Sequence, residues 1–143
     1  MLRAIPGYSH LKCLSPSSQR TAMSAPRSSP DASLRACIQI ALDVACGVRP
    51  TASLQRPTYD GQVRIHVRAY LKAHTLRGPV ALQHIDVRLV PPPPVTDPFA
   101  IRILEAAEVV GTYSVSGKAK AFATRLELPE GKRQWIMRTL RLF

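Results

Sequence analysis

Residues 33–50, which read SLRACIQIALDVACGVRP, decide how the rest of the chain divides into elements. Apolar residues recur there at intervals of three and four and so form one stripe along an α-helix: Leu34, Cys37, Ile38, Ala41, Leu42 and Ala45. Asp31 or Ser33 can cap the start of this helix. Gly47 supplies the left-handed residue that commonly ends a helix, and Pro50 prevents it from resuming, so we predict a helix between these signals.

Residues 59–74 carry two competing patterns. Val63, Ile65 and Val67 alternate with polar residues, as they would in a half-buried strand. A helical stripe also runs through the same segment: Val63, Val67, Tyr70, Leu71 and His74. Asp60 would lie near the positive end of that helix. The length of the segment and its place after a first helix favour a second helix, which is our prediction, with a strand as the alternative.

From residue 80 onward the pattern is typical of strands. Ile85, Val87 and Leu89 alternate with polar residues until four prolines follow at 91–94. These prolines cannot pair within a sheet and form a stiff, extended linker. Further strands are predicted over residues 101–115, 118–128 and 134–142, joined by tight turns at 116–117 and 129–132. Gly111 is expected to mark a bulge.

The order of helices followed by antiparallel strands predicts one α+β domain over residues 31–143. One or two N-terminal helices would pack on a three- to four-stranded antiparallel sheet in a two-layer, cone-like arrangement. Residues 1–30 lack acidic residues, hold seven Ser and four Pro, and predict a disordered, basic tail. Such a segment is also typical of an organellar transit peptide, although Pro6 and Gly7 interrupt the helix that these peptides need. A third interpretation is that translation starts at Met23.

The chain has a net charge of +11, to which fifteen Arg and five Lys contribute. Arg binds phosphate and carboxylate groups in a forked geometry, so this charge is compatible with a nucleic acid or an acidic protein as partner. No apolar run is long enough to span a bilayer. Cys13, Cys37 and Cys46 lack metal-ligand spacing, and an odd number of cysteines is typical of a reducing compartment, so we expect a cytoplasmic protein.

The sequence contains no recognisable catalytic or metal-binding motif. His66 and His74 could share a helix face, but no third ligand follows at a suitable spacing. Glu105 and Glu108 would point to opposite faces of a strand. The Ser-Gly-Lys sequence at 116–118 lacks the earlier glycine and the following helix of a phosphate-binding loop. We therefore expect no catalysis, no cofactor and no metal.

Two stretches resemble a known family. One is ALDVACGVRP at residues 41–50, with Leu54 shortly after it, and the other is GKAKAFA at residues 117–123, with Trp135 in the last strand. Together they are similar to the small Ala-, Arg- and Pro-rich proteins of actinobacteria, over roughly residues 32–143. The resemblance implies a second helix and a small cone-shaped sheet of the nuclear-transport-factor type. It implies no chemistry, because the family has no established activity.

These observations predict a non-catalytic protein-interaction domain, an adaptor that offers a groove or a sheet edge to another protein. The alternatives are a basic nucleic-acid-binding protein and a small ligand-binding or enzymatic domain with a pocket between helices and sheet. The candidate partner-binding residues are Arg64, Arg68, Lys72, Lys118, Lys120, Arg138 and Arg141. An unbroken last strand would place Met137 and Arg141 on one face and Arg138 on the other. Trp135 and Met137 are expected in the core.

Overall fold

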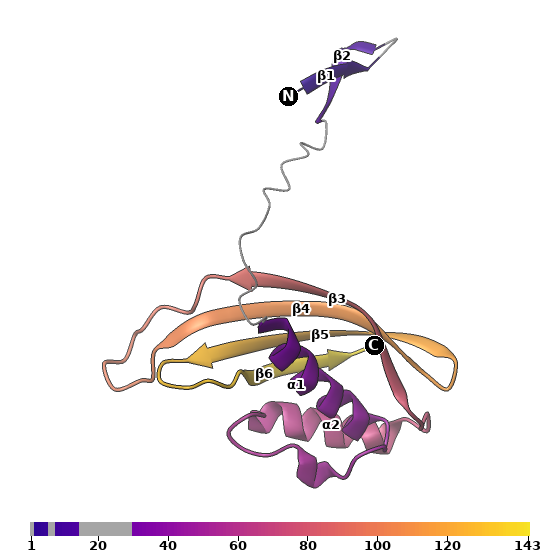
Figure 1. The fold of residues 1–143 in the computed structure, drawn as a ribbon, viewed down its shortest axis with the longest axis vertical. Helices are drawn as coiled ribbons and strands as arrows, with labels where there is room; N and C mark the ends of the chain where they lie inside the picture. Colours follow the sequence, from indigo (N-terminus) through magenta and orange to yellow (C-terminus); the bar gives the residue numbers. More distant parts are fainter. Residues whose placement is uncertain (1, 6–7, 15–29) are drawn as a thin grey trace.

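The computed structural model describes residues 2–5, 8–14 and 30–143. Its elements in chain order are β1 (Leu2–Ile5), β2 (Tyr8–Leu14), α1 (Pro30–Ala45), the short 3-10 helix η1 (Thr51–Ser53), α2 (Gly61–Ala73), β3 (Val80–Val90), β4 (Ile103–Val115), β5 (Lys118–Pro129) and β6 (Ile136–Leu142). Strands β3, β4, β5 and β6 form an antiparallel sheet in that spatial order (Figure 1). The prediction of one or two helices on a three- to four-stranded antiparallel sheet is confirmed, with two helices and four strands.

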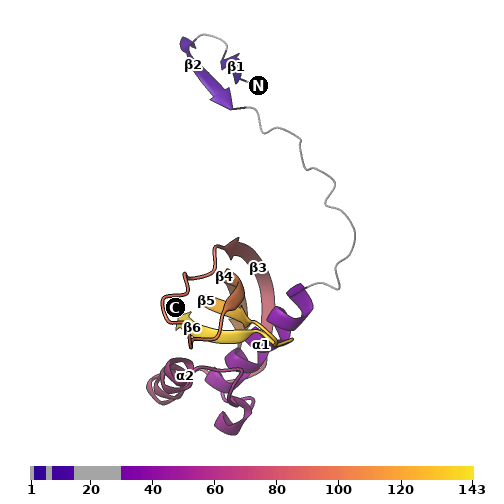
Figure 2. The same ribbon diagram turned by 90° about the vertical axis from the view of Figure 1, so that its left-hand side faces the viewer.

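Both helices lie on the same side of the sheet (Figures 1 and 2). Helix α1 packs against β3 and against α2, and α2 packs along β6. The core between the layers is fully buried, and its largest members are Leu34, Ile38, Leu42, Val63, Val67, Val109, Tyr113, Phe122, Leu126 and Met137. Trp135, which is 5% exposed, also belongs to this core, as predicted.

Both helix predictions are confirmed. Gly47 follows α1 with a φ of 76°, the left-handed conformation expected after a helix. In α2, the buried residues Val63, Val67 and Tyr70 are those of the helical stripe. The side chain of Asp60 caps this helix, because its Oδ1 accepts a hydrogen bond from the Gln62 backbone at 3.2 Å.

Arg77 connects the ends of the two helices. Its guanidinium donates hydrogen bonds to the carbonyl oxygens of Leu71 and His74, which are unsatisfied groups at the C-terminus of α2. Its aliphatic stem crosses Gly47, where an added Cβ would lie 2.7 Å from the Arg77 Cδ. Gly47 therefore serves both to end α1 and to admit the cap of α2.

Register shifts interrupt β3, β4 (between Ile103 and Glu105) and β6, and the bulges in β3 and β6 determine which residues of the two edge strands face the helices. The first interrupts β3 between Leu82 and His84, whereas Gly111 lies in regular register opposite Ile85. The prediction of a bulge at Gly111 is therefore wrong. The position needs glycine for a different reason, because an added Cβ would overlap the carbonyl oxygen of His84 and lie 2.8 Å from the Phe122 ring. The absence of a side chain at this position allows two neighbouring strands to come close.

The second bulge lies in β6, where the register shifts between Met137 and Thr139. It leaves Met137 buried but places Arg141 opposite Ala123, on the sheet face that points away from the helices. The expectation that Arg141 shares a face with Met137 is therefore wrong. The hydroxyl of Thr124 donates to the carbonyl oxygen of Thr139 at 2.7 Å next to this bulge, which satisfies a buried polar group.

The prediction of a disordered tail over residues 1–30 falls largely on residues outside those described. Within that segment β1 and β2 form a two-stranded antiparallel sheet, which the sequence did not predict. The described part of the chain contains no helix with the length and apolar character needed to cross a membrane.

We predict that Gly111→Ala lowers the free energy of unfolding by about 2 kcal/mol, because the new methyl group overpacks the contact between β3, β4 and β5. Urea denaturation followed by circular dichroism measures this change. Gly131→Ala is the matched control: Gly131 has a φ of 76° and nothing within 4 Å of an added Cβ, so only backbone strain of about 1 kcal/mol is expected. A smaller loss for Gly111→Ala than for Gly131→Ala would contradict the packing argument.

Candidate functional site

The two edges of the four-stranded sheet differ in how they are covered. At the β6 edge, the Met137 N–H donates to the Thr58 carbonyl at 2.8 Å, and the Asp60 N–H donates to the Met137 carbonyl at 3.0 Å. Tyr59 thereby forms a parallel bridge to Met137. Helix α2 begins directly after this bridge and packs along the same strand. The β6 edge is therefore partly closed by the chain itself.

Strand β3 forms the opposite edge. It pairs with β4 on one side, and within residues 2–5, 8–14 and 30–143 no strand pairs with its other side. Backbone N–H and C=O groups along a free edge are a ready template for another strand. Because β3 extends from residue 80 to residue 90, it offers a long main-chain surface.

The side chains of β3 form two rows. The row on the helix-covered face is apolar and partly buried at Ile85 and Val87, where the first turns of α1 lie against it, whereas Leu89 is 65% exposed. The row on the other face holds His84, Asp86 and Arg88, which are exposed. An apolar row and a charged row thus lie side by side on one free edge.

More apolar side chains are exposed near the end of β3. The segment that follows the four prolines carries Phe99, which is 94% exposed, and Ile101, which is 68% exposed. Asp97 orders this segment, because its Oδ1 accepts a hydrogen bond from the Phe99 N–H at 2.9 Å. Leu104, at the start of β4, is 46% exposed. An exposed apolar group of this kind is typical of an interaction surface.

The structure does not bring the predicted basic residues together on one surface. Arg64, Arg68 and Lys72 lie on α2, whereas Lys118 and Lys120 lie in the register positions of β5 that face the helices. Arg138 and Arg141 lie on the opposite face of the sheet, in β6. Helix α2 and the two faces of the sheet therefore divide the seven positions among three surfaces.

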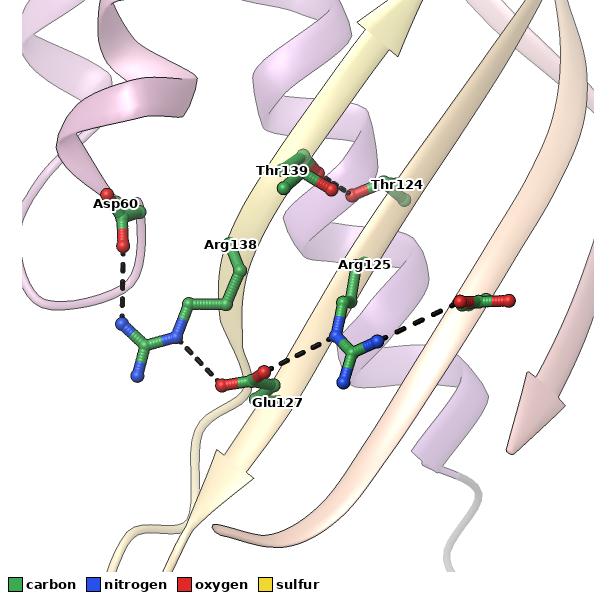
Figure 3. Close-up of polar contacts among 7 residues, drawn as sticks. Asp60, Thr124, Arg125, Glu127, Arg138 and Thr139 are labelled. Carbon is green, nitrogen blue, oxygen red and sulfur yellow. Dashed lines mark hydrogen bonds and ion pairs between the residues drawn. The ribbon is translucent and has the colours of Figure 1, made fainter. Parts of the chain in front are cut away.

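Arg138 is engaged in a chain of ion pairs rather than free for a partner. Its guanidinium lies 3.3 Å from Asp60 and 3.0 Å from Glu127, and Glu127 in turn lies 3.4 Å from Arg125 (Figure 3). Arg125 continues the chain to Glu108 at 3.8 Å. These contacts run from the start of α2 across β6, β5 and β4. The carboxylates of this chain are paired and hydrogen-bonded, which indicates a structural role.

The pKa of the Asp60 carboxyl lies below its usual value of 3.8, mainly because the Gln62 N–H bonds to it and also because Arg138 lies beside it. A depressed pKa in the folded state means that the ionised carboxylate stabilises the fold above about pH 4. That stabilisation is lost as the pH falls through the folded pKa.

We therefore predict that Asp60→Asn lowers stability at about pH 7 by roughly 1 kcal/mol, since Asn still caps the helix but no longer pairs with Arg138. The difference from wild type should shrink as the pH falls from about 4 through the folded pKa of Asp60, because protonation removes the charge that pairs with Arg138. Urea denaturation at several pH values measures it. An equal loss at every pH would contradict the role of the charge.

The buried thiols are not poised for nucleophilic chemistry. Burial raises the pKa of the Cys37 thiol to about 11, although a hydrogen bond with the Tyr59 side chain acts to lower it. The Tyr59 hydroxyl also donates to the Cys37 carbonyl oxygen at 2.8 Å. Burial also raises the pKa of Cys46, against the opposing effect of the positive charges of Arg77 and Lys120. Both residues are therefore thiols at neutral pH, and the thiolate is the reactive form.

We predict that, in a Cys13→Ser variant, iodoacetamide at about pH 8 leaves both remaining cysteines unmodified while the protein is folded, because their pKa values are raised by burial. Both should be alkylated in denaturant. Intact-mass spectrometry counts the added groups. Rapid modification of the native protein, at a rate matching the denatured one, would contradict this prediction.

Histidines and acids also do not converge on a metal site. No group of three His, Cys, Asp or Glu residues that could hold a metal occurs among the residues the structure describes. His74 stacks on Tyr70 with ring centroids 3.9 Å apart, whereas His66 and His84 are exposed on α2 and β3. A depression of about 560 Å³ between α2 and the end of β6 is lined by Gln62, His66 and residues 139–143, and no carboxylate side chain lines it.

No protein-family model, curated protein or solved structure matches this chain. The resemblance to the small Ala-, Arg- and Pro-rich proteins of actinobacteria stays a prediction that rests on the residues quoted for it. The free edge of β3 could have been inferred from the sequence, because strands joined by consecutive hairpins leave the first and last strands at the edges. The cover on β6 could not, since it depends on a bridge from residue 59 to residue 137.

Proposed function

We propose that this protein is an interaction domain of the adaptor type that binds another protein by adding a strand to β3. The observation that carries the proposal is the contrast between the two edges of the sheet. Residues 58–60 bond to β6, whereas the outer side of β3 has no such partner in the described ranges. Natural proteins commonly cover or blunt a long edge strand, and an open one is a recognition surface.

Strand addition draws affinity from main-chain hydrogen bonds and specificity from alternate side chains. On β3, side chains from an added strand would cover the apolar row that ends at Leu89. On the other face they would meet Asp86 and Arg88. A partner strand with apolar residues on one face and charged residues on the other suits this edge.

The rival functions have less support. A nucleic-acid-binding surface would draw on basic residues that lie on three surfaces, with Arg138 already paired to Glu127 and Asp60. A catalytic function would need an activated group, and the two buried thiols are protonated at neutral pH. A cytoplasmic location is part of our proposal, supported by the free, buried Cys37 and Cys46.

We predict that Leu89→Lys abolishes binding of the protein partner, because it places a charge in the apolar row of the edge strand. Ile65→Lys is the matched control: Ile65 is 66% exposed, close to the 65% of Leu89, but it lies on α2. Tagged full-length variants would be expressed in the native cells, and partners identified by mass spectrometry. Hydrogen exchange of the purified complex then tests whether the partner slows exchange of β3 amides.

The proposal requires a partner that is retained by Ile65→Lys, lost with Leu89→Lys and protective of β3. A partner that binds both variants equally and leaves β3 unprotected would refute strand addition. The nucleic-acid alternative has its own test, a mobility-shift assay at low salt, because phosphate contacts strengthen as salt is reduced. Salt-sensitive retention of DNA or RNA would favour that alternative.

A further inference from the structure

We infer that the strand added to β3 is β3 of a second copy of this chain, paired antiparallel about a two-fold axis at Val87. This inference rests on the proposed function and names its partner. In this arrangement the helices of both copies lie on the same side of one continuous sheet, with four strands from each copy. Closed two-fold pairing of identical surfaces is the commonest form of protein self-association.

Charge selects this register. With Val87 opposite its own copy, Asp86 of each chain lies directly opposite Arg88 of the other, on the exposed face of the sheet. Residues directly opposite each other in an antiparallel pair have Cβ atoms about 5 Å apart, close enough for opposite charges to interact. The two-fold axis forms this ion pair twice. An axis at Asp86 or at Arg88 would instead place like charges against each other.

The length of regular strand selects the same register. The bulge between Leu82 and His84 interrupts β3 on one side, and Pro91 follows it on the other. Only residues 84–90 are therefore available for a regular ladder. An axis at Val87, the middle of this stretch, uses all of it, whereas an axis at Ile85 or Leu89 would use only a few residues.

The apolar face offers a place for the exposed Leu89. Across the same axis Leu89 lies opposite Ile85 of the other copy. A small hollow of about 90 Å³, lined by Leu34, Arg35, Ile85 and Val87, lies at this point between α1 and β3. Leu89 of the second copy would cover this hollow. The side chain that is 65% exposed in one chain and the hollow in the other thus complement each other.

A charge-exchange experiment tests both the dimer and its register. The full chain is studied by sedimentation velocity over a range of concentrations, and we expect a reversible dimer. Asp86→Arg and Arg88→Asp each create two repulsive pairs across the axis, so each variant alone should dissociate with a Kd raised about tenfold or more. An equimolar mixture of the two variants restores both ion pairs, as does the double variant D86R/R88D. Both should dimerise like the wild type.

The controls separate folding from association. Arg88 lies opposite Glu108 within its own sheet, so circular dichroism must verify that Arg88→Asp folds. Asp86 lies opposite Val110, and Asp86→Arg adds no like charge there. If Arg88→Asp does not fold, comparison of Asp86→Arg with the wild type decides the question.

Each outcome has one meaning. A wild-type chain that stays monomeric at high concentration overturns the inference but leaves strand addition by a different protein standing, since the Leu89→Lys experiment tests that separately. A dimer that neither single substitution weakens uses another surface, and this also overturns the inference. Dissociation by single variants with no rescue in the mixture or the double variant overturns the register at Val87.

Discussion

The short backbone pairing between residues 58–60 and β6 determines much of this structure. Two hydrogen bonds, from Met137 to Thr58 and from Asp60 to Met137, hold the chain against the last strand just before α2 begins. Asp60 then caps α2 and pairs with Arg138 of the same strand. One contact therefore sets the start of the second helix, anchors it over β6 and covers that edge. Since a sheet of this kind has two edges, β3 is the edge that the described residues leave without a paired strand.

Ion pairing and burial account for several of the reactive groups among the described residues. The charged side chains that meet on the sheet are paired with one another in the chain of ion pairs from Asp60 to Glu108. The thiols are buried and protonated. A buried polar atom, the hydroxyl of Tyr113, lacks a hydrogen-bond partner, but it lies inside the closed core. The edge of β3 offers main chain and the side chains beside it, which suits the strand partner that we propose.

The local patterns of the sequence were sufficient for the two helices and the four strands after residue 30, but not for β1 and β2 or for the faces of the strands. The apolar stripe and Gly47 predict α1, and the stripe through Val67 predicts α2. The β-branched residues of this segment favour a strand, but packing on β6 outweighs that propensity. The bulges at residues 83 and 138 were missed, since a bulge depends on which strands pair. For this reason the alternation of the sequence predicts the wrong face for Arg141 and a bulge at Gly111, whereas the bulge lies in the neighbouring strand β3. The candidate edge could have been inferred from the order of the strands. The basic residues are chosen by charge alone, and the structure places them on three different surfaces.

The free edge of β3 is restricted rather than unprotected. A bulge, a proline and charged residues are the devices that natural proteins use to prevent indiscriminate pairing of edge strands. Here the bulge and Pro91 delimit a regular stretch, and the charges within it are one acid and one base two positions apart. Two like charges at positions 86 and 88 would repel an identical strand with the axis at residue 86, 87 or 88, whereas Asp86 and Arg88 repel it with the axis at 86 or 88 and attract it with the axis at 87. In the pairing that we infer, the features that would otherwise block this edge specify the partner.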